Sequence, residues 1–387
     1  MGWPQALRAR IRFDRNELAG SFGDIGTDLP LIVAMIPAAG LDAASVFIVF
    51  GVVQILTGLL YGLPMPMQPL KAMAVIVITQ HLTADVLFGG GLAIGVIMLG
   101  LSLSGALGWL ARVIPHPVVR GIQFGLGLTL ASLALQRYVP ADGVSGYVLA
   151  AVAFVITVAL LGNRRFPAAL PVIGLGVVYA LASGVDLGHI GNGVGLSTPE
   201  LRVPAWDSVL TGLLVLAIPQ LPLSLSNSVI ATDRTLRDLF PERRIGIRKI
   251  GLTYSLVNLL CPFFSGIPVC HGCGGLAGHH AFGARTGGSV IIYGTMYLVI
   301  GIAFAGVAET VVKVFPQPLL GVILLFEALV LMMFVRDVMT SRSEAAIALL
   351  VGVLALGLPH GFVVGVVVGT VLFYVARRFP ILGNHEH

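Results

Sequence analysis

The chain has little charge, few cysteines and no long polar stretch that could form a soluble domain. Asp, Glu, Lys and Arg make up 11% of its 387 residues, against about 25% in ordinary globular domains. Hydrophobic residues make up 57%, so a water-soluble fold of this chain could not cover its own surface. Three cysteines cannot build a disulfide framework. These shortages exclude a set of soluble domains and indicate a protein embedded in lipid.

Apolar stretches separated by polar residues, Pro or Gly predict about 14 membrane-spanning segments in an all-α polytopic fold. At about 20 residues each, these segments would account for roughly 280 residues. We expect them near residues 18–38, 43–61, 68–80, 86–110, 118–136, 145–162, 168–185, 208–229, 247–264, 272–282, 287–308, 317–335, 344–357 and 361–377. The segments at 68–80 and 272–282 are too short to span alone, and each follows an extended stretch rich in Pro or Gly.

The distribution of positive charge tests this order of segments. All 23 Lys and Arg residues fall on the side of the N-terminus except Arg137, Arg202, Lys313 and Lys71. Because positive residues collect on the cytoplasmic side, we expect both termini in the cytoplasm. The net charge of +5 then reflects topology, and nucleic acid is not an expected partner. The preference for Arg over Lys is typical of GC-rich bacterial genomes, so the expected location is the bacterial inner membrane.

The two halves of the chain echo each other at an offset of about 200 residues, as in transporters built from inverted repeats. Pro117–Gly121 corresponds to Pro318–Gly321, and the short helix after Pro69 corresponds to the one after Gly272. An odd number of segments per half, seven, would place the halves in opposite orientations. The expected parts are a cytoplasmic segment 1–17, a first repeat 18–190, a second repeat 207–378 and a cytoplasmic tail 379–387. The alternative is that Pro-rich loops recur by chance.

Two short helices that meet near the membrane midplane would point their N-termini at one small volume. Unpaired N–H groups and the positive end of each helix dipole make such a place a candidate anion site. The residues expected there are Gln68, Pro69, Leu70 and Lys71 in the first half, and His271, Gly272, Cys273, Gly274 and Gly275 in the second. Gln68 and His271 could donate hydrogen bonds. The glycines either let a ligand approach the backbone or let helices pack closely.

A neutral polar stripe interrupts the apolar segment at 208–229. Gln220, Ser224 and Asn227 recur at i, i+4 and i+7, which places them on one face of a helix. All three can donate hydrogen bonds, which an oxyanion accepts without requiring a full countercharge. The alternative is that these side chains join neighbouring helices.

Intramembrane charges form a further group of candidate residues. We expect Lys71 one turn into its short helix, on the face of Gln68, where a cation opposes the helix dipole and needs a negative partner or ligand. Asp24 and Asp28, with Thr27 between them, are the candidates; they could bind, couple transport to protons, or cap a helix near the membrane edge. Glu327 is a third acid, with pairing, proton coupling and structural hydrogen bonding as alternative roles.

Cys270 and Cys273 have the spacing of a metal or redox motif, but no second pair accompanies them. We therefore expect no metal and no cofactor. Adjacent residues on one helical turn do not face each other, so His271 and these thiols are poor candidates for the nucleophile and base of an enzyme. A carrier is favoured over a channel or an intramembrane enzyme, because opposed short helices form one closed site.

Five stretches resemble the molybdate transporter family of plants and bacteria, which is related to the sulfate permeases (SulP). They are Gly23–Leu31, Pro64–Ala72, Gln220–Leu223 with Asn227–Ile230, Pro268–Ala277 and Phe282–Thr286. The resemblance implies a seven-plus-seven inverted repeat divided into core and gate domains. It also implies secondary active transport of molybdate, a tetrahedral oxyanion, by alternating access, with the anion held between the first, third, eighth and tenth helices.

Two differences from the sulfate permeases bear on the expected substrate. Those proteins usually carry a soluble STAS domain after the last helix, where this chain has a short tail after Arg377, and they often have Ser and Arg where this chain has glycines. Both differences favour molybdate, with sulfate or another dianion as the alternative and tungstate as a further candidate. The lipid bilayer and a second copy of the chain, in a homodimer, are the other expected partners.

Overall fold

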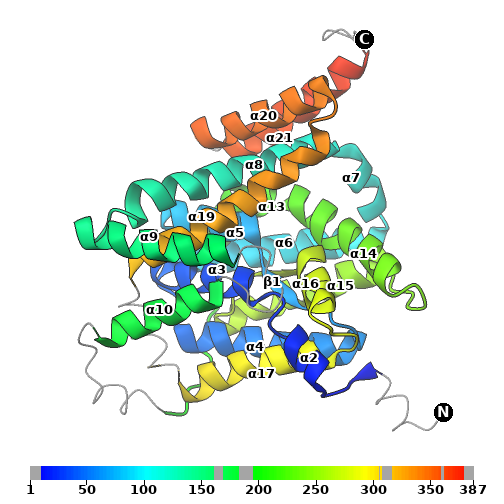
Figure 1. Cartoon of the computed structure of the whole chain (residues 1–387). Helices are drawn as coiled ribbons and strands as arrows, with labels where there is room; N and C mark the ends of the chain where they lie inside the picture. The colour runs from blue at the N-terminus through cyan, green and yellow to red at the C-terminus, as the bar shows by residue number, and fades with distance from the viewer. Residues whose placement is uncertain are drawn as a thin grey trace, which may run out of the picture.

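The computed structural model describes residues 10–160, 169–182, 195–304, 306, 316–358 and 361–378, and almost all of its regular structure is helical (Figure 1). The first half contains α2 (Arg15–Gly20), α3 (Ile25–Ala39), α4 (Ala43–Tyr61), α5 (Lys71–Gln80), α6 (Ala84–Ser104), α7 (Leu107–Val113), α8 (His116–Leu133), η1 (Ala134–Tyr138), α9 (Gly143–Ala159) and α10 (Ala169–Ala182). The second half contains α12 (Trp206–Gly212), η2 (Leu213–Ala217), α13 (Ile218–Leu223), η3 (Ser224–Ala231), α14 (Thr232–Leu239), α15 (Ile247–Leu260), η4 (Cys261–Phe264), α16 (Cys273–Ala281), α17 (Gly288–Ala303), α19 (Gln317–Met333), η5 (Phe334–Val338), α20 (Arg342–Gly357) and α21 (Gly361–Arg378).

Several of these helices are suited to a membrane. Within the described ranges, six helical stretches are long and apolar enough to cross one: Ala43–Tyr61, Ala84–Ser104, His116–Tyr138, Trp206–Leu239, Gln317–Val338 and Gly361–Arg378. Shorter apolar helices lie at Thr27–Ala39, Lys71–Gln80, Gly143–Ala159 and Gly288–Ala303. The expectation of a mostly helical membrane protein is confirmed, and the number of about 14 spans stays a prediction.

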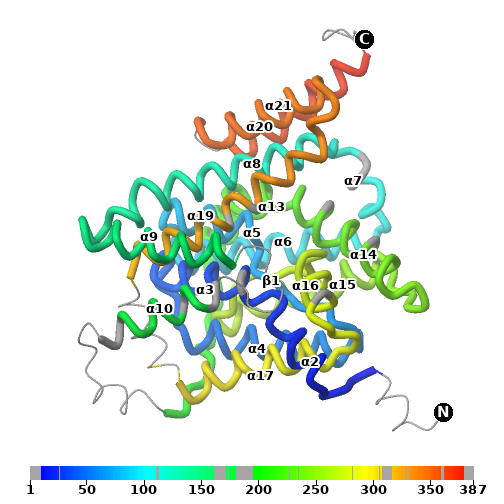
Figure 2. Tube along the Cα trace, viewed as in Figure 1, coloured from blue at the N-terminus to red at the C-terminus, as the bar shows by residue number. Residues whose placement is uncertain are grey.

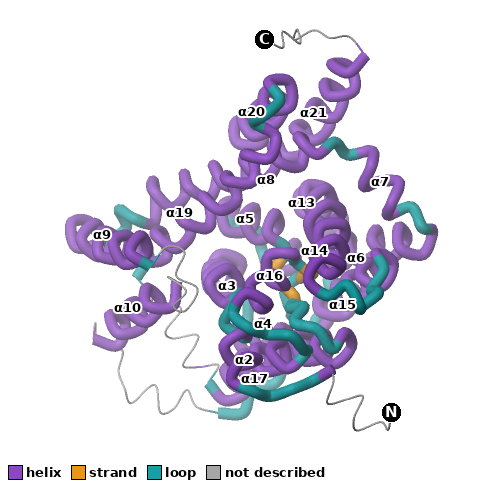
Figure 3. Tube along the Cα trace, turned by 45° about the vertical axis from the view of Figure 1, so that its right-hand side comes forward, coloured by secondary structure: helices purple, strands orange, loops and turns teal. Residues whose placement is uncertain are grey.

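The all-α expectation is wrong at one place in the centre of the molecule. The strands β1 (Met67–Pro69) and β2 (Val269–His271) pair antiparallel, with Gln68 opposite Cys270. Helices surround this pair on all sides in Figure 3. Because Pro69 restricts Gln68 to an extended conformation, the segment expected at 68–80 becomes helical only at Lys71. The segment expected at 272–282 likewise begins at Cys273.

Two buried amide side chains close the outer edges of this strand pair. Gln54 of α4 donates from Nε2 to the Met67 carbonyl (2.6 Å) and accepts from the Met67 N–H at Oε1 (2.9 Å). Asn258 of α15 does the same for Val269, with a donated bond of 2.6 Å and an accepted bond of 2.9 Å. Extended backbone inside a membrane has no water with which to form hydrogen bonds. Gln54 and Asn258 therefore satisfy the outer N–H and C=O groups of the strand pair.

The single helix expected at 18–38 is instead two helices, α2 and α3, with a break at Ser21–Asp24. The break lets the backbone approach α16 closely, since a Cβ on Gly23 would lie 2.5 Å from the Gly278 carbonyl carbon. The buried Glu17 of α2 anchors the same region, because its carboxylate accepts bonds from the N–H groups of Arg285, Thr286 and Ser289 at 2.9–3.0 Å.

Two other expected boundaries differ. The segment expected at 86–110 ends at Ser104, because Gly105 takes the left-handed conformation (φ 75°) that terminates helices, and α7 follows. The segment expected at 208–229 continues to Leu239, with wide π-helical turns at η2 and η3. Pro219 and Pro222 lack the N–H groups that a regular α-helix needs there.

The remaining expected segments coincide with observed helices to within a few residues. The segment 1–17 is described only from residue 10, and the tail 379–387 lies outside the described residues.

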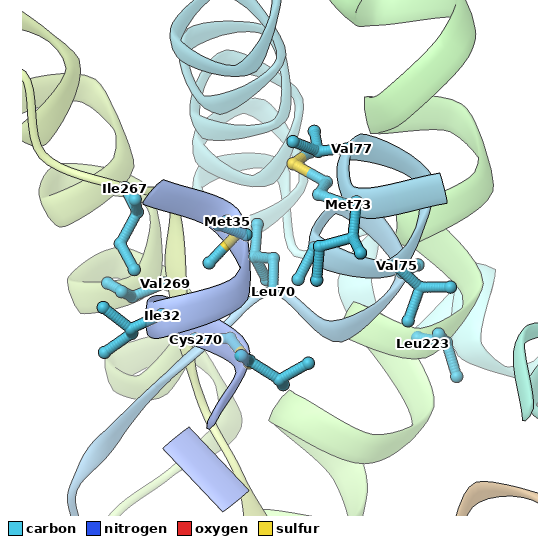
Figure 4. Packing of buried hydrophobic residues seen from close by; sticks show 14 of the residues in the cluster. Ile32, Met35, Leu70, Met73, Val75, Val77, Leu223, Ile267, Val269 and Cys270 are labelled. Carbon is cyan, nitrogen blue, oxygen red and sulfur yellow. The ribbon is translucent and has the colours of Figure 1, made fainter. Parts of the chain in front are cut away.

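The helices form two groups with a shared boundary. In one, α4 packs against α17, and α6 packs against α12 and α15; in the other, α8 packs against α19, α20 and α21. Figures 1 and 2 show α8, α19, α20 and α21 above α4 and α17, with β1 and α5 between these two sets. At the boundary, Leu70 is buried beside Met35 of α3 (Figure 4), so the beginning of α5 is embedded in the hydrophobic core.

The close contact of α4 with α17 generates a stability prediction. A Cβ on Gly51 would lie 2.6 Å from the Gly294 carbonyl oxygen, so Gly51→Ala should lower the free energy of unfolding by about 1–3 kcal/mol. Gly100→Ala in α6 is the matched control, because a Cβ there would meet nothing within 4 Å and alanine favours helix. Thermal unfolding in detergent measures both variants. Equal melting temperatures would contradict the packing described for Gly51.

Candidate functional site

A cavity of about 40 Å³ lies where α5 and α16 begin, with room for about three water-sized spheres. One wall comes from the strands and the helices that follow them, with α13 and η3: Gln68, Lys71, Gln220, Leu223, Asn227, Ser228, Cys270, Cys273 and Gly274. The other lining residues come from α8, α19 and η5: Gln123, Leu331 and Phe334. A ligand in this cavity would therefore contact α8, α19 and η5 as well as the helices α5, α13 and α16.

The cavity brings together some of the residues expected from sequence and not others. Those that line it are Gln68, Lys71, Gln220, Asn227, Cys273 and Gly274. Those that are not among its lining residues are Pro69, Leu70, Ser224, His271, Gly272 and Gly275. Strand geometry explains part of this division, since successive side chains of a strand point to opposite faces. Gln68 and Cys270 face the cavity, so Pro69 and His271 do not.

His271 is occupied elsewhere in the structure. Its buried ring lies with Nε2 3.1 Å from Thr253 Oγ1 and packs edge-on against Tyr61, with ring centroids 5.2 Å apart. The expected role of His271 as a donor at the mouth of the site is therefore not supported by its position.

The N-terminus of α5 is capped by a side chain. Gln220 accepts at Oε1 from the N–H groups of Ala72 (2.9 Å) and Met73 (3.3 Å), and its Nε2 donates to Ser224 Oγ (3.1 Å). Ser224 Oγ in turn lies 2.8 Å from the hydroxyl of Tyr254. Gln220 and Ser224 thus join helices and satisfy the positive end of α5, which was the alternative reading of the polar stripe.

Lys71 is the first residue of α5, and Gln68 belongs to β1, so the expectation that they share a helical face one turn into the helix is wrong. Pro69 has no N–H, and the Leu70 N–H donates to the Pro268 carbonyl at 3.1 Å. Within Pro69–Lys71, the expected backbone contact with an anion therefore rests on Lys71.

Among the described residues, no side chain caps the N-terminus of α16, which follows Gly272 and lies at the cavity through Cys273 and Gly274. The sequence left two alternatives for the glycines, close packing of helices and approach of a ligand to the backbone, and different glycines suit each. A Cβ on Gly272 would collide with Gln68 Oε1, and one on Gly275 would collide with Asp24 Oδ2, so these glycines allow close packing. A Cβ on Gly274 would meet nothing within 4 Å. First-turn N–H groups at such a helix end suit an anion.

Asn227 lies in η3 and faces the cavity beside α16. Its Oδ1 accepts a bond from the Cys273 thiol at 3.0 Å, so its Nδ2 is the end that can donate to a ligand. Within the described residues, no group of three or more His, Cys, Asp or Glu could hold a metal ion, and Cys273 is instead the partner of Asn227.

Asp24, which precedes α3, and Asp28 of α3 are both buried. Gln68 Nε2 donates to both carboxylate oxygens of Asp24, at 2.7 and 2.8 Å, and Lys71 acts on Asp24 electrostatically. Asp28 accepts a hydrogen bond from the Tyr293 hydroxyl at 3.0 Å. The Tyr293 hydroxyl also lies 3.2 Å from the hydroxyl of Tyr297. Both acids are 4% exposed or less, and Asp24 stands at the N-cap position of α3 without a side-chain cap bond.

Thr27 and Glu327 are the other two residues expected from sequence. Thr27 is half-buried, and its N–H donates to the Asp24 carbonyl at 3.0 Å. Glu327 belongs to α19, and its side chain lies outside the described part of the structure.

Sequence reasoning did not identify the cavity residues of α8, α19 and η5. Gln123 was the one polar signal among them, a lone amide in an apolar helix. Isolated polar residues in apolar helices were also the only signal for Gln54 and Asn258.

Comparison with known proteins identifies relatives along most of the chain. The sequence profile of a family described as "Molybdate transporter of MFS superfamily" matches residues 16–130 and 212–331. "Molybdate transporter 2" of Arabidopsis thaliana is 33% identical over 90% of this chain and 84% of its own length, and "Molybdate transporter 1" of the same plant is 31% identical over 93% and 87%. The transmembrane domain of a cyanobacterium bicarbonate transporter, BicA, has the same fold, with a TM-score of 0.68 at 18% identity over 94% of this chain and 98% of that domain.

The contrast between adjacent glycines of α16 generates a prediction. Gly275→Ala should lower the free energy of unfolding by about 1–3 kcal/mol, because its Cβ would collide with the Asp24 carboxylate. Gly274→Ala, the matched control, should melt like the wild type because its Cβ enters open space. Thermal unfolding of the purified chain distinguishes them, and a larger loss in Gly274→Ala would refute the geometry of this helix end.

Proposed function

The chain belongs to the molybdate transporter family, and we propose that it is a secondary active transporter that carries molybdate across the membrane by alternating access. The anion binds in the cavity where α5 and α16 begin. The observation that carries this proposal is the N-terminus of α16, which no side chain of the described residues caps and which lies at a cavity that Lys71 also lines.

The chemistry of the cavity suits an oxyanion. Molybdate is a tetrahedral dianion that accepts hydrogen bonds and donates none. The first N–H groups of α16, the Nδ2 group of Asn227 and the ammonium of Lys71 are all donors. The lining residues of the described chain include no Asp or Glu, and the nearby carboxylate of Asp24 accepts from Gln68 Nε2.

The balance of charge suits a carrier that must release its substrate. A helix N-terminus contributes about half an elementary charge, and Lys71 contributes one. Together they fall short of the two negative charges of molybdate, so the anion is attracted without being trapped. Neutral donors then add selectivity by size and geometry.

A second cavity supports alternating access. It has a volume of about 330 Å³, and Gln80, Pro219 and Phe362 are among its lining residues. The two cavities lie along the same helices, since α5 runs from Lys71 to Gln80 and α13 has Gln220 beside Pro219. Sliding of the α8–α19–α20–α21 group, as a gate, along α5 and α13, as part of a core, would open one cavity while closing the other.

Symmetric contacts support the inverted repeat of seven segments in each half. Counting the expected segments, α4 with α17 pairs the second and eleventh, and α15 with α6 pairs the ninth and fourth, which a two-fold exchange of the halves would interchange. Gln54 and Asn258 hold β1 and β2 through the same pair of bonds from equivalent helices. We further propose cytoplasmic termini, following the positive charge, and a homodimer in the bilayer.

Sulfate or another dianion is the second candidate substrate, because donors of this kind recognise any tetrahedral oxyanion. An enzymatic role is not proposed, since the relatives are named as transporters. Tungstate has nearly the size and charge of molybdate, whereas sulfate is smaller, so competition among the three distinguishes the readings.

Uptake of radiolabelled molybdate into proteoliposomes tests the function. We expect saturable uptake that tungstate inhibits as well as unlabelled molybdate does, with sulfate at least about tenfold weaker. Gly274→Ala, which keeps the fold, should raise the KM for molybdate about tenfold because its methyl group occupies the cavity. Gly100→Ala is the control. Equal inhibition by sulfate would assign the chain to the second candidate, and no uptake of any of the three would reject the proposal.

The buried acids support a proposal for coupling. An interior-negative membrane opposes entry of a dianion by about 2.3 kcal/mol per charge per 100 mV, so uptake needs a co-transported cation. Asp28, which accepts from Tyr293, can carry a proton, and Asp24 is the second candidate. The acid would take the proton when the anion engages Lys71.

We therefore expect uptake to accelerate as external pH falls, because protons reach Asp28 from outside. Asp28→Asn keeps the size and the bond from Tyr293 but is always neutral, so its uptake should lose this dependence on pH. The exposed Asp207→Asn is the control. If the rate of wild-type uptake changes neither with pH nor with a proton ionophore, the acids have a structural role only.

A further inference from the structure

Arg120 of α8 lies beside the cavity, and its guanidinium is shared between two partners. Nη1 donates to Gln123 Oε1 at 2.9 Å, and Nη2 forms an ion pair with Asp337 of η5. The guanidinium carbon also lies 5.2 Å from the ring centroid of Phe334. Gln123 and Phe334 line the cavity, so Arg120 supports its α8–η5 wall from behind.

The bond from Arg120 determines how Gln123 is presented. A guanidinium has donors and no acceptor, so the end of the Gln123 amide that faces it must be the carbonyl oxygen. The NH₂ end is then directed away from Arg120. Because Gln123 is 2% exposed and lines the cavity, this donor is available to a ligand inside it.

Arg120 is also close enough to affect the opposite wall. Its charge acts on the Cys273 thiol at the start of α16, as does that of Lys71. Its buried Nε has no hydrogen-bond partner among the described residues. The Arg120 side chain is 19% exposed and that of Asp337 is 51% exposed, so water partly screens their ion pair.

We propose that Arg120 is a positioning residue for anion binding: by holding the carbonyl oxygen of Gln123, it directs the Gln123 NH₂ group at the anion. The inference rests on the proposed function. It adds a donor from α8 to the donors that α5, η3 and α16 supply. An anion bound by donors on both sides of the cavity connects α8 with η3 and α16. The packing of α8 and η5 then depends on whether the cavity holds an anion.

The simpler alternative is that Arg120 only joins α8 to η5 through Asp337. The two readings differ at Gln123. If Gln123 is a donor, its replacement changes anion affinity while the fold persists. If Arg120 acts through Gln123, its own replacement has a smaller effect once Gln123 has been changed.

The test measures the Kd of tungstate for the purified full-length chain by titration calorimetry, together with the melting temperature without the anion. Gln123→Glu keeps an acceptor for Arg120 but presents a carboxylate to the cavity, so tungstate affinity should fall more than about tenfold. Gln123→Met removes the donor at similar size and should weaken binding about tenfold. Arg336→Ala, which removes the neighbouring exposed arginine of η5, should bind like the wild type.

Non-additivity identifies the route of the effect. Arg120→Ala should weaken tungstate binding clearly more in the wild type than in the Gln123→Met background, where only the direct effect of its charge is lost. Wild-type affinity in both Gln123 variants, or an undiminished effect of Arg120→Ala in the Gln123→Met background, would overturn the inference. If Arg120→Ala does not fold, the two Gln123 variants decide the matter. Failure of the wild type itself to bind tungstate and molybdate would reject the proposed function instead.

Discussion

The structure depends on satisfying extended backbone in the middle of a membrane protein. An unpaired N–H or C=O group in an apolar interior costs several kcal/mol, so non-helical chain there must find partners. Pairing of β1 with β2 supplies the inner bonds, and the amides of Gln54 and Asn258 supply the outer ones. Because these bonds hold both strands, they also determine where α5 and α16 begin, and the cavity lies between those two helix ends.

The two helix ends are related by position but differ in chemistry. Gln220 caps α5 and occupies the N–H groups of Ala72 and Met73, whereas no side chain in the described part of the chain caps α16. An anion is therefore attracted to one end by backbone N–H groups and to the other by the charge of Lys71. Under the proposed function, this asymmetry would place the anion at α16, with Asn227 beside it.

The sequence predicts the breaks in the helices, because Pro69 and the glycines after Cys270 disfavour helical conformation locally. The sequence does not predict which side chains point into the cavity. Extended chain alternates its side chains, so Gln68 and Cys270 reach the cavity while His271 does not. Gln54, Asn258 and Arg120 contact residues that are not their neighbours on the same helix, and the local sequence pattern does not predict such contacts.

The position of the bound anion tests the account most directly. Tungsten scatters strongly enough to be located in a structure of the chain saturated with tungstate. We predict one strong density peak in the cavity, within hydrogen-bond reach of the Gly274 N–H, the Asn227 amide and Lys71 Nζ. A peak confined to the second cavity beside Gln80 and Phe362, with none at α16, would contradict the central claim.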